Sequence, residues 1–524
     1  MKNLLKEIDC SRIIFLLVFF LAVIFQLENI RRSFSGSMYP REIQTLSITK
    51  GLTRDFNPFY PTIQYNGPIN KYVFYEFPFY QMLVAALYHS FCHDLILSGR
   101  IVSVILWLSS LIVVFFILKT ISETRSKQNG TSLYLTLIYV LACLVLTLQG
   151  SAIQPDILMF FLYNLSIFLL YQSLKKKGYF LWNVSCLVIS LSILAKSYSF
   201  ILLILPSLYC AYKSSAGVWQ FTVKCLSWIL IAVLPISLWT LHGICVYREF
   251  PGYYSSVTSL FDWFKPELFL PDNYLHYYTR ILWHIRFCFH MNYGFLSIVE
   301  GFLLACSLIF FVIKGCRFWL MILLSALFYL IVFNSVTAFH YYYLLPLLLP
   351  FAVSLFFLLE HSHRAVRLAA CVLFLLHFFM TSVTGRTEFN KILIGENDAK
   401  CGEMIKKMIP PHQSIIVSSY PTGGLLFFTD LYGWNLNLNY AEEAIYLMVM
   451  KKKPPDRENL IKTRFDEYVK QGADYYAITD FMNLQCYPLL INRLMDQYPI
   501  IYYDPNHLII FDLHPAKNGR NKSD

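Results

Sequence analysis

The sequence predicts a polytopic α-helical membrane protein with a small α/β domain, on the extracytoplasmic side, at its C-terminal end. Three observations support this fold class. The chain of 524 residues is 57% hydrophobic and only 14% charged, with a mean hydropathy of +0.51, far from a soluble average. Apolar runs recur along most of its length. After about residue 387 the composition becomes ordinary, and helical and strand patterns alternate.

Apolar runs in the first three quarters of the chain form the predicted membrane spans. A helix needs about 17–25 apolar residues to cross a bilayer. The eleven runs that approach this length lie near residues 13–29, 97–118, 132–149, 157–173, 181–196, 198–212, 225–244, 294–313, 318–336, 341–360 and 368–384.

Basic residues in the short loops predict how these spans are oriented. The residues that fall on one side are Lys2, Lys6, Arg12, Lys119, Arg125, Lys127, Lys175, Lys176, Lys177, Lys213, Lys224, Lys314, Arg317, Arg364 and Arg367. This is the positive-inside pattern, so we expect a cytoplasmic N-terminus and, with eleven spans, an extracytoplasmic C-terminus. The same pattern explains the net charge of +11, and no zinc-finger spacing, basic helix or RNA-binding motif points to nucleic acid.

The domain boundaries follow from these runs. Residues 1–386 are predicted to form the transmembrane domain, including outward loops at 31–95 and 248–292. Residues 387–516 are predicted to form the α/β domain, and residues 517–524 a disordered tail. Within the α/β domain the expected elements are helices at 398–408, 455–471 and 484–496, strands at 414–418 and 474–479, a turn ending at Gly433-Trp434, and a hairpin at 499–512.

Polar side chains gather at the outward ends of the predicted spans. Charges at the edge of a bilayer often mark a functional site. The first loop carries Arg41, Glu42, Gln44 and Glu76, and Asp156 lies at the next outward turn. Simpler roles are open for several polar residues. Glu76 and Asp156 could cap the helices that follow them. Lys196 could extend its ammonium to the interface, and Arg41 and Arg100 could be interface anchors. His340 and the tyrosines after it could form an aromatic belt.

Several short motifs occur in a familiar order over residues 38–360. They are Arg41-Glu42-Ile43-Gln44-Thr45, Phe56-Asn57-Pro58-Phe59-Tyr60-Pro61, Glu76-Phe77-Pro78-Phe79-Tyr80, Gly99-Arg100-Ile101-Val102-Ser103, Pro155-Asp156, Leu194-Ala195-Lys196, and His340 followed by Tyr341 to Tyr343 and Leu344-Leu345-Pro346. Together they resemble GT-C-type polytopic glycosyltransferases that use polyprenyl-phosphate sugars. This group includes protein O-mannosyltransferases and the lipid A aminoarabinose transferase, and the likeness is greatest to its bacterial, family 39-like branch.

The resemblance implies an integral membrane glycosyltransferase in the bacterial inner membrane. Such an enzyme moves a monosaccharide from a polyprenyl-phosphate donor to a hydroxyl of lipid A, another glycan or a protein, with inversion, at the outer face. The reaction needs a base for the acceptor proton and positive charge for the departing phosphate. The implied phosphate-binding and substrate-binding residues are Lys196, Arg100, Arg280, His340 and Tyr342. Glu76 and Asp156 could hold a divalent metal cation, and no other cofactor is implied.

One position departs from the motif of the family. Aligned on Arg41, the catalytic aspartate of the family falls at Gln44, which cannot act as a base. Glu42 could serve instead if the local register differs, although two residues on a helix are about 200° apart. Asp55 is a second alternative. A third is lost or changed activity, which makes the chain a non-catalytic carrier or scaffold for lipid-linked sugars.

Overall fold

The structure is a computed structural model, and it describes residues 10–31, 39–65, 67–68, 71–123, 130–250, 308–333, 341–390, 394–419, 424–438 and 456–514. Contacts between Cα atoms divide the chain into two compact units. The membrane unit comprises residues 1–32, 75–244 and 256–388. The C-terminal unit comprises residues 33–74, 245–255 and 389–524. Each unit is described separately.

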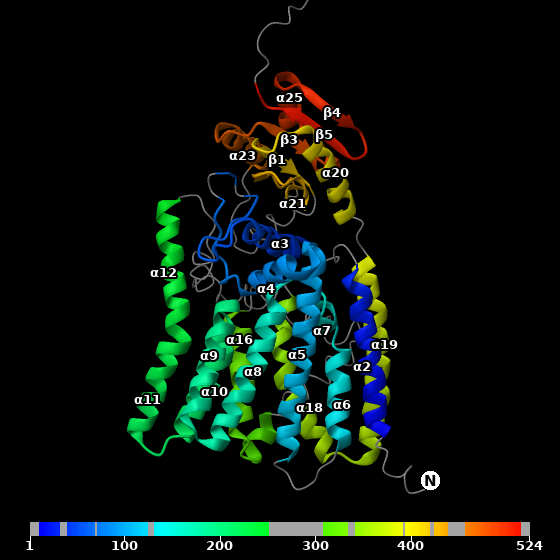
Figure 1. Cartoon of the computed structure of the whole chain (residues 1–524). Coiled ribbons are helices and arrows are strands. Elements are labelled where there is room, and N and C mark those ends of the chain that lie inside the picture. The colour runs from blue at the N-terminus through cyan, green and yellow to red at the C-terminus, as the bar shows by residue number, and fades with distance from the viewer. Residues whose placement is uncertain are drawn as a thin grey trace, which may run out of the picture. The chain divides into compact units, whose positions relative to one another are not determined.

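The regular secondary structure in the described part of the membrane unit is helical (Figure 1). Its α-helices are α2 (Cys10–Ile30), α4 (Phe79–Leu87), α5 (Leu95–Glu123), α6 (Gly130–Ala142), α7 (Leu144–Gln149), α8 (Pro155–Lys176), α9 (Tyr179–Ala195), α10 (Ser199–Lys213), α11 (Val218–Trp228), α12 (Leu234–Glu249), α16 (Arg317–Val332), α18 (Leu348–His361) and α19 (Arg364–Asn390). Short π-helical turns occur at Tyr88–Cys92 and Ile229–Val233, and a 3₁₀ segment, η5, spans Tyr341–Leu347.

In the described part of the chain, six helical stretches are long and apolar enough to cross a bilayer, so the chain is a multi-pass membrane protein. They are Cys10–Ile30, Leu95–Glu123, Pro155–Lys176, Val218–Glu249, Tyr342–His361 and Arg364–Thr387. Shorter apolar helices lie at Gly130–Ala142, Tyr179–Ala195, Ser199–Lys213 and Arg317–Val332. The polytopic helical fold is confirmed. The number of eleven spans stays a prediction, because most of the expected span at 294–313 lies outside the described residues.

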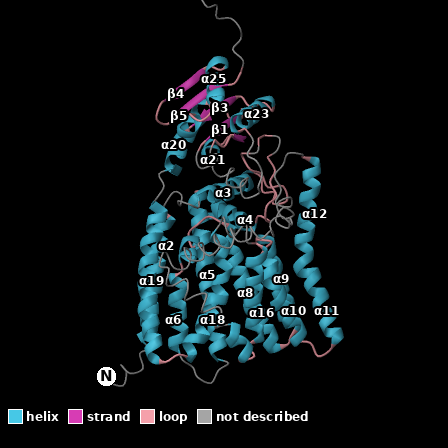
Figure 2. Ribbon diagram, turned by 180° about the vertical axis from the view of Figure 1, so that it is seen from behind, coloured by secondary structure: helices cyan, strands magenta, loops and turns pink. Residues whose placement is uncertain are grey.

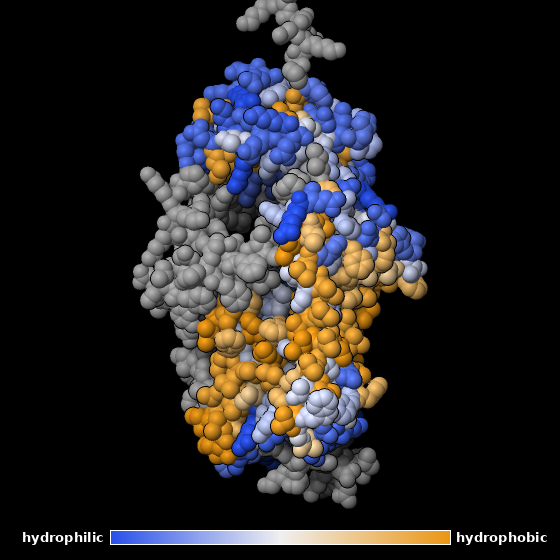
Figure 3. Space-filling view, turned by 90° about the vertical axis from the view of Figure 1, so that its left-hand side faces the viewer, coloured by the Kyte–Doolittle hydropathy of each residue, from blue (hydrophilic) through white to orange (hydrophobic). Residues whose placement is uncertain are grey.

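Burial separates a central helix from peripheral ones. In the apolar stretch of Tyr342–His361, 89% of the residues are buried. The corresponding shares are only 22% for Val218–Glu249 and 17% for Arg364–Thr387. Apolar side chains gather over the helices on the face shown in Figure 3, as expected for surface that contacts lipid. Helices α8 and α9 pack together, as do α5 with α8 and α10 with α16, and both ribbon views show these helices running side by side (Figures 1 and 2).

The C-terminal unit contains a five-stranded mixed sheet (Figure 2). Its strands are β1 (Ile415–Ser418), β2 (Gly433–Asn435), β3 (Tyr475–Ile478), β4 (Ile500–Asp504) and β5 (Leu508–Asp512), in the order β2-β1-β3-β5-β4. Strand β1 is parallel to β2 and β3, and β5 is antiparallel to β3 and β4. The predicted strands at 414–418 and 474–479 and the hairpin at 499–512 are therefore confirmed. The expected turn at Gly433-Trp434 is instead strand β2.

Both faces of this sheet are covered, because successive strand residues point to opposite faces. Ile416 and Tyr476 pack in one apolar cluster with residues of α23 (Arg457–Lys470) and α25 (Pro488–Gln497). Ile415, Val417 and Ala477 pack in a second cluster with residues of α20 (Ile394–Met408) and α21 (Gly424–Thr429). The predicted helices at 398–408 and 455–471 are present as α20 and α23. The predicted helix at 484–496 is present as α25, and the short helix α24 (Phe481–Leu484) precedes it.

The C-terminal unit also contains helix α3 (Tyr39–Arg54) from the first loop. The sequence predicts that this loop belongs to the transmembrane domain, with a boundary at residue 386. Contacts instead group residues 33–74 with the C-terminal residues. Two backbone hydrogen bonds join these segments. The N–H of Gly433 donates to the carbonyl of Gln64 at 2.9 Å, and the N–H of Gly67 donates to the carbonyl of Gly433 at 2.6 Å.

Candidate functional site

Lys196 lies where the helical backbone of the membrane unit is interrupted. It follows α9 directly, in an extended conformation with φ −154° and ψ 112°. Its N–H still bonds to the carbonyl of Ser192, and its carbonyl accepts from the N–H of Ser199 at the start of α10. The helix is therefore interrupted at Lys196, while the backbone N–H and carbonyl of this residue both stay hydrogen-bonded.

Two carboxylates converge on this lysine. The Lys196 Nζ lies 3.2 Å from Glu76 Oε1 and 3.8 Å from Asp156 Oδ2. The side chains of Lys196, Glu76 and Asp156 are 5%, 11% and 0% exposed. With one cation and two anions, the formal charge of this carboxylate–lysine cluster is negative. Buried charges are usually paired, and in this cluster the ammonium pairs with both carboxylates.

Three tyrosines line the carboxylate–lysine cluster. Tyr198 Oη donates to Asp156 Oδ1 at 3.2 Å. The ring of Tyr198 packs against those of Tyr329 and Tyr343, with centroids 5.4 and 5.2 Å apart. Tyr329 Oη donates to the backbone carbonyl of Tyr343, and the Lys196 ammonium is 5.9 Å from the Tyr343 ring centroid. An aromatic wall next to an ion cluster excludes water and strengthens its electrostatics.

Backbone contacts hold Glu76 beside the lysine. The N–H of Phe77 donates to the carbonyl of Leu194 at 3.0 Å, which ties the segment after Glu76 to the last turn of α9. The Phe77 ring packs edge-on against Trp239, and the Trp239 indole N–H donates to the carbonyl of Tyr75. The Glu-Phe-Pro-Phe-Tyr motif is therefore fixed to two helices.

The Gly99-to-Ser103 motif supports the connection that carries Asp156. Arg100 Nη1 donates to the carbonyl of Ser151 at 2.5 Å, and Ser103 Oγ donates to the carbonyl of Ala152 at 2.6 Å. An added Cβ at Gly99 would lie 2.7 Å from Ile153 Cγ2, so only glycine allows this close approach. The motif lies near the start of α5 and contacts the α7–α8 connection at three successive residues.

The simpler roles for Asp156 and Lys196 do not match this geometry. The N-cap of α8 is Gln154, which makes no side-chain capping bond, while the Asp156 carboxylate faces Tyr198 and Lys196. The lysine side chain is too buried to extend into the interface. Both residues therefore serve the carboxylate–lysine cluster rather than a helix end or the bilayer edge.

The described residues do not complete a metal centre. Two carboxylates suit a hard divalent cation, and Asp156 Oδ2 accepts no hydrogen bond from any described residue. The Lys196 ammonium, however, already lies against both carboxylates. No group of three or more histidine, cysteine, aspartate or glutamate side chains with the spacing of a metal site occurs in the described part of the chain.

The residues predicted to be catalytic lie in the C-terminal unit, on α3. The helix is continuous, so Arg41 and Gln44 share a face, and Arg41 Nη1 donates to Gln44 Oε1. Glu42 is fully buried in the first turn and points about 200° away from Gln44. Asp55 follows the helix and is exposed. The regular helix does not supply the register shift that would place Glu42 on the face of Gln44.

The remaining candidates fall elsewhere. Arg280, His340, most of the loop at 248–292 and the tail at 517–524 lie outside the described residues. Tyr342 is buried and packs on Tyr343, and it is Tyr343 whose ring lies near the ammonium. Sequence reasoning missed Tyr198 and Tyr329. The position of Tyr198 two residues after Lys196 was a usable signal, whereas nothing near Tyr329 marked it.

Comparison with solved structures identifies this architecture. Over 97% of this chain and 99% of the other, it superposes on apo ArnT from Cupriavidus metallidurans with a TM-score of 0.56 and 12% identity. The same protein bound to undecaprenyl phosphate gives a TM-score of 0.54. The chain has a GT-C fold. The resemblance inferred from the motifs is thereby confirmed at the level of the fold.

A second GT-C neighbour is archaeal. The Archaeoglobus fulgidus oligosaccharyltransferase in complex with Zn and sulfate matches with a TM-score of 0.52 and 10% identity, over 94% of this chain and 73% of the other. The oligosaccharyltransferase AglB from the same organism, with an inhibitory peptide and a dolichol-phosphate, gives a TM-score of 0.52. No protein-family model and no curated protein matches the sequence.

Proposed function

We propose that this protein is an integral membrane glycosyltransferase that moves a monosaccharide from a polyprenyl-phosphate donor to an acceptor hydroxyl, with inversion. The observation that carries the proposal is the buried carboxylate–lysine cluster of Glu76, Asp156 and Lys196 within a GT-C fold. Neighbours of this fold have been solved with undecaprenyl phosphate and with a dolichol-phosphate, which supports a lipid phosphate as the ligand.

In the proposed reaction the acceptor oxygen attacks the anomeric carbon of the sugar as the bond from that carbon to the phosphate oxygen breaks. The bonding electrons leave with the lipid phosphate, which gains negative charge. Lys196 is the proposed partner for that charge, because a held ammonium is already oriented before the charge develops. Phosphate leaves readily, so no strong general acid is needed, unlike ordinary glycoside hydrolysis.

The acceptor proton requires a base, and we assign it to a carboxylate of the first loop. Glu42 is the first candidate and Asp55 the second, since Gln44 has no basic oxygen at neutral pH. Arg41 is the proposed partner that orients this part of α3. Arg100, Arg280, His340 and Tyr342 remain proposed contributors to substrate binding. A divalent ion at Glu76 and Asp156 also remains a prediction, and the proposed reaction includes no step that depends on it.

We place the reaction at the outer face of the bacterial inner membrane, with the N-terminus in the cytoplasm and the C-terminal domain outside. The acceptor is lipid A, another glycan or a protein. The Arg41–Gln44 hydrogen bond supports an alternative, because a glutamine at this position suits binding without catalysis. In that alternative the chain is a non-catalytic carrier or scaffold for lipid-linked sugars.

The test is sugar transfer by the full chain in proteoliposomes. The donors are a set of radiolabelled polyprenyl-phosphate sugars, and the acceptor is an outer-membrane lipid extract. Wild type is compared with Glu42→Gln, Asp55→Asn and Glu76→Gln. Removing the general base is expected to lower the transfer rate by roughly 10²–10⁴-fold.

The outcomes separate the alternatives. Transfer that is lost in Glu42→Gln identifies the base, and transfer lost only in Asp55→Asn moves that role to Asp55. Donor binding without transfer of any sugar by wild type would contradict the enzyme and favour the carrier. Lys119→Met is a control for an unrelated substitution in the same chain, because Lys119 is 50% exposed and pairs with Glu123.

A further inference from the structure

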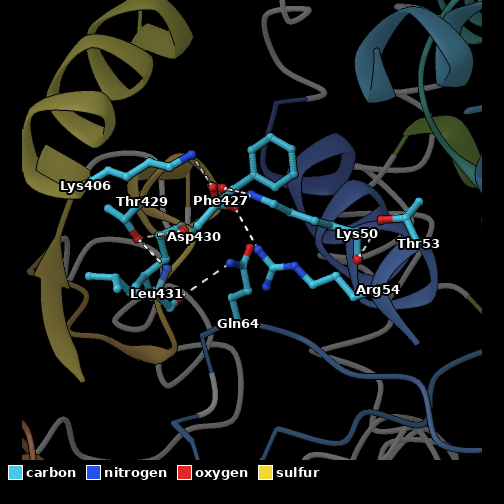
Figure 4. A network of polar contacts seen from close by, with 10 residues as sticks. Lys50, Thr53, Arg54, Gln64, Lys406, Phe427, Thr429, Asp430 and Leu431 are labelled. Atoms are coloured by element: carbon cyan, nitrogen blue, oxygen red, sulfur yellow. Dashed lines mark hydrogen bonds and ion pairs between the residues drawn. The ribbon is translucent and has the colours of Figure 1, made fainter. Parts of the chain in front are cut away.

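Helix α3 is held at its C-terminal end by one carboxylate. Asp430 follows α21, and Lys50 and Arg54 of α3 both approach it, with Arg54 Nη2 at 2.9 Å from Oδ1. Lys406 of α20 approaches the same carboxylate, with its Nζ 2.5 Å from Oδ2. Figure 4 shows the three basic side chains pointing toward Asp430 from these two helices. One anion therefore joins α3 to α20 and α21.

Lys50 contacts α21 as well as Asp430. Its Nζ also donates to the backbone carbonyl of Phe427 at 2.6 Å and lies 4.6 Å from the centroid of the Phe427 ring (Figure 4). Burial lowers the pKa of Lys50, and the hydrogen bond to Asp430 opposes that change. Burial alone would raise the pKa of Asp430, but hydrogen bonds from Lys406 and Lys50 hold it below its usual value. The basic side chains around Asp430 therefore favour the charged form of its carboxylate.

The N-terminal end of α3 is held by a second carboxylate. Tyr39, the first residue of the helix, donates its Oη hydrogen to Asp398 Oδ2 at 2.6 Å, and both side chains are fully buried. An added Cβ at Gly424 would lie 1.8 Å from Tyr39 Oη and 2.3 Å from Asp398 Oδ2. The first residue of α21 therefore packs directly against the hydrogen bond between Tyr39 and Asp398.

These two attachments lie on either side of the residues assigned to catalysis. Arg41, Glu42 and Gln44 lie on α3 between Tyr39 and Lys50, the residues through which the two attachments are made. A helix fixed at both ends cannot rotate or slide, so the direction of each side chain between them is fixed too. Errors of about 1 Å in the position of a reacting group can cost 10²-fold in rate.

We propose that the C-terminal unit positions helix α3 for catalysis through Asp398 and Asp430, an inference that rests on the proposed function. These two residues are positioning residues, because they act through α3 rather than on substrate. The C-terminal unit is then a working part of the transferase, in place of a lid that only stabilises the chain or a surface that only holds the acceptor.

The test measures order in α3 and transfer in the same variants of the full chain. Asp430→Asn is the main variant, because Asp430 has a positive φ of 61° that asparagine also tolerates, so the change removes charge and little else. Arg54→Gln is a milder variant in case Asp430→Asn does not fold. Asp466→Asn is the matched control, since Asp466 is 27% exposed like Asp430 and pairs with Arg493 away from α3.

We expect amide hydrogens of α3 to exchange faster with deuterium in Asp430→Asn than in wild type or Asp466→Asn. The transfer rate at saturating donor should fall by roughly 10- to 100-fold, with the donor KM little changed. Unchanged α3 exchange in Asp430→Asn and Arg54→Gln would overturn the proposal. Faster exchange with an unchanged transfer rate would overturn it as well. If wild type transfers no sugar at all, the proposed function fails, and the exchange data still report whether Asp430 orders α3.

Discussion

Replacing Lys196 by methionine removes a cation that lies against both Glu76 and Asp156. Methionine has a similar length and no charge, so the change leaves two buried carboxylates beside each other. Asp156 keeps the hydrogen bond from Tyr198, but Glu76 loses a contact of 3.2 Å. Because the three side chains are between 0% and 11% exposed, water compensates little. Breaking a buried pair in this way costs about 3–5 kcal/mol.

Thermal unfolding of the detergent-purified full chain, followed by tryptophan fluorescence, measures this cost. We expect Lys196→Met to have the lowest midpoint in the series. The double variant Lys196→Met/Asp156→Asn should recover part of the loss, since only one buried carboxylate then remains. Lys119→Met removes an exposed pair with Glu123 and should change stability by less than about 1 kcal/mol. Equal midpoints for Lys196→Met and Lys119→Met would refute the reasoning, because the carboxylates would then not depend on the ammonium.

Two further predictions follow from single residues. Burial raises the pKa of Asp398 to about 7 from 3.8, so the folded chain keeps a proton that the unfolded chain loses. Stability should therefore fall as pH rises from about 4 to 7, by at most about 4 kcal/mol, and Asp398→Asn should remove this slope in thermal unfolding. Gly99→Ala should cost about 1–3 kcal/mol through its clash with Ile153, and Gly178→Ala, which meets nothing within 4 Å, is its control in the same assay.

The helical fold could be predicted because its signals are local. A span is a long apolar run, and the loops between spans carry the basic residues, so Cys10–Ile30, Leu95–Glu123 and Pro155–Lys176 follow from composition and length. The strands of the C-terminal unit have the same property, since Ile415–Ser418 and Tyr475–Ile478 are short β-branched or aromatic runs. Strand β2 was missed because Gly433–Asn435 has only three residues, too few for a sequence pattern, and the strand is defined by its pairing with β1.

The site could be predicted only in part, because its geometry depends on contacts between distant residues. Motif order brought attention to Glu76, Asp156 and Lys196, and the structure places these three together. The sequence could not predict that Arg100 donates to the carbonyl of Ser151, because every residue has a backbone carbonyl whatever its side chain. The grouping of α3 with the C-terminal residues was likewise hidden. Lys50 and Asp430 are 380 positions apart, and no local pattern pairs them.

The most direct test of the central claim is single-turnover sugar transfer from a polyprenyl-phosphate donor in proteoliposomes by wild type, Lys196→Met and Lys119→Met. We predict that wild type and Lys119→Met transfer the sugar at similar rates. Lys196→Met should be slower by roughly 10²–10³-fold, the usual cost of losing one group that stabilises developing charge. Equal transfer by all three proteins would contradict the role of the carboxylate–lysine cluster. The absence of transfer by wild type, with the donor bound, would contradict the glycosyltransferase itself.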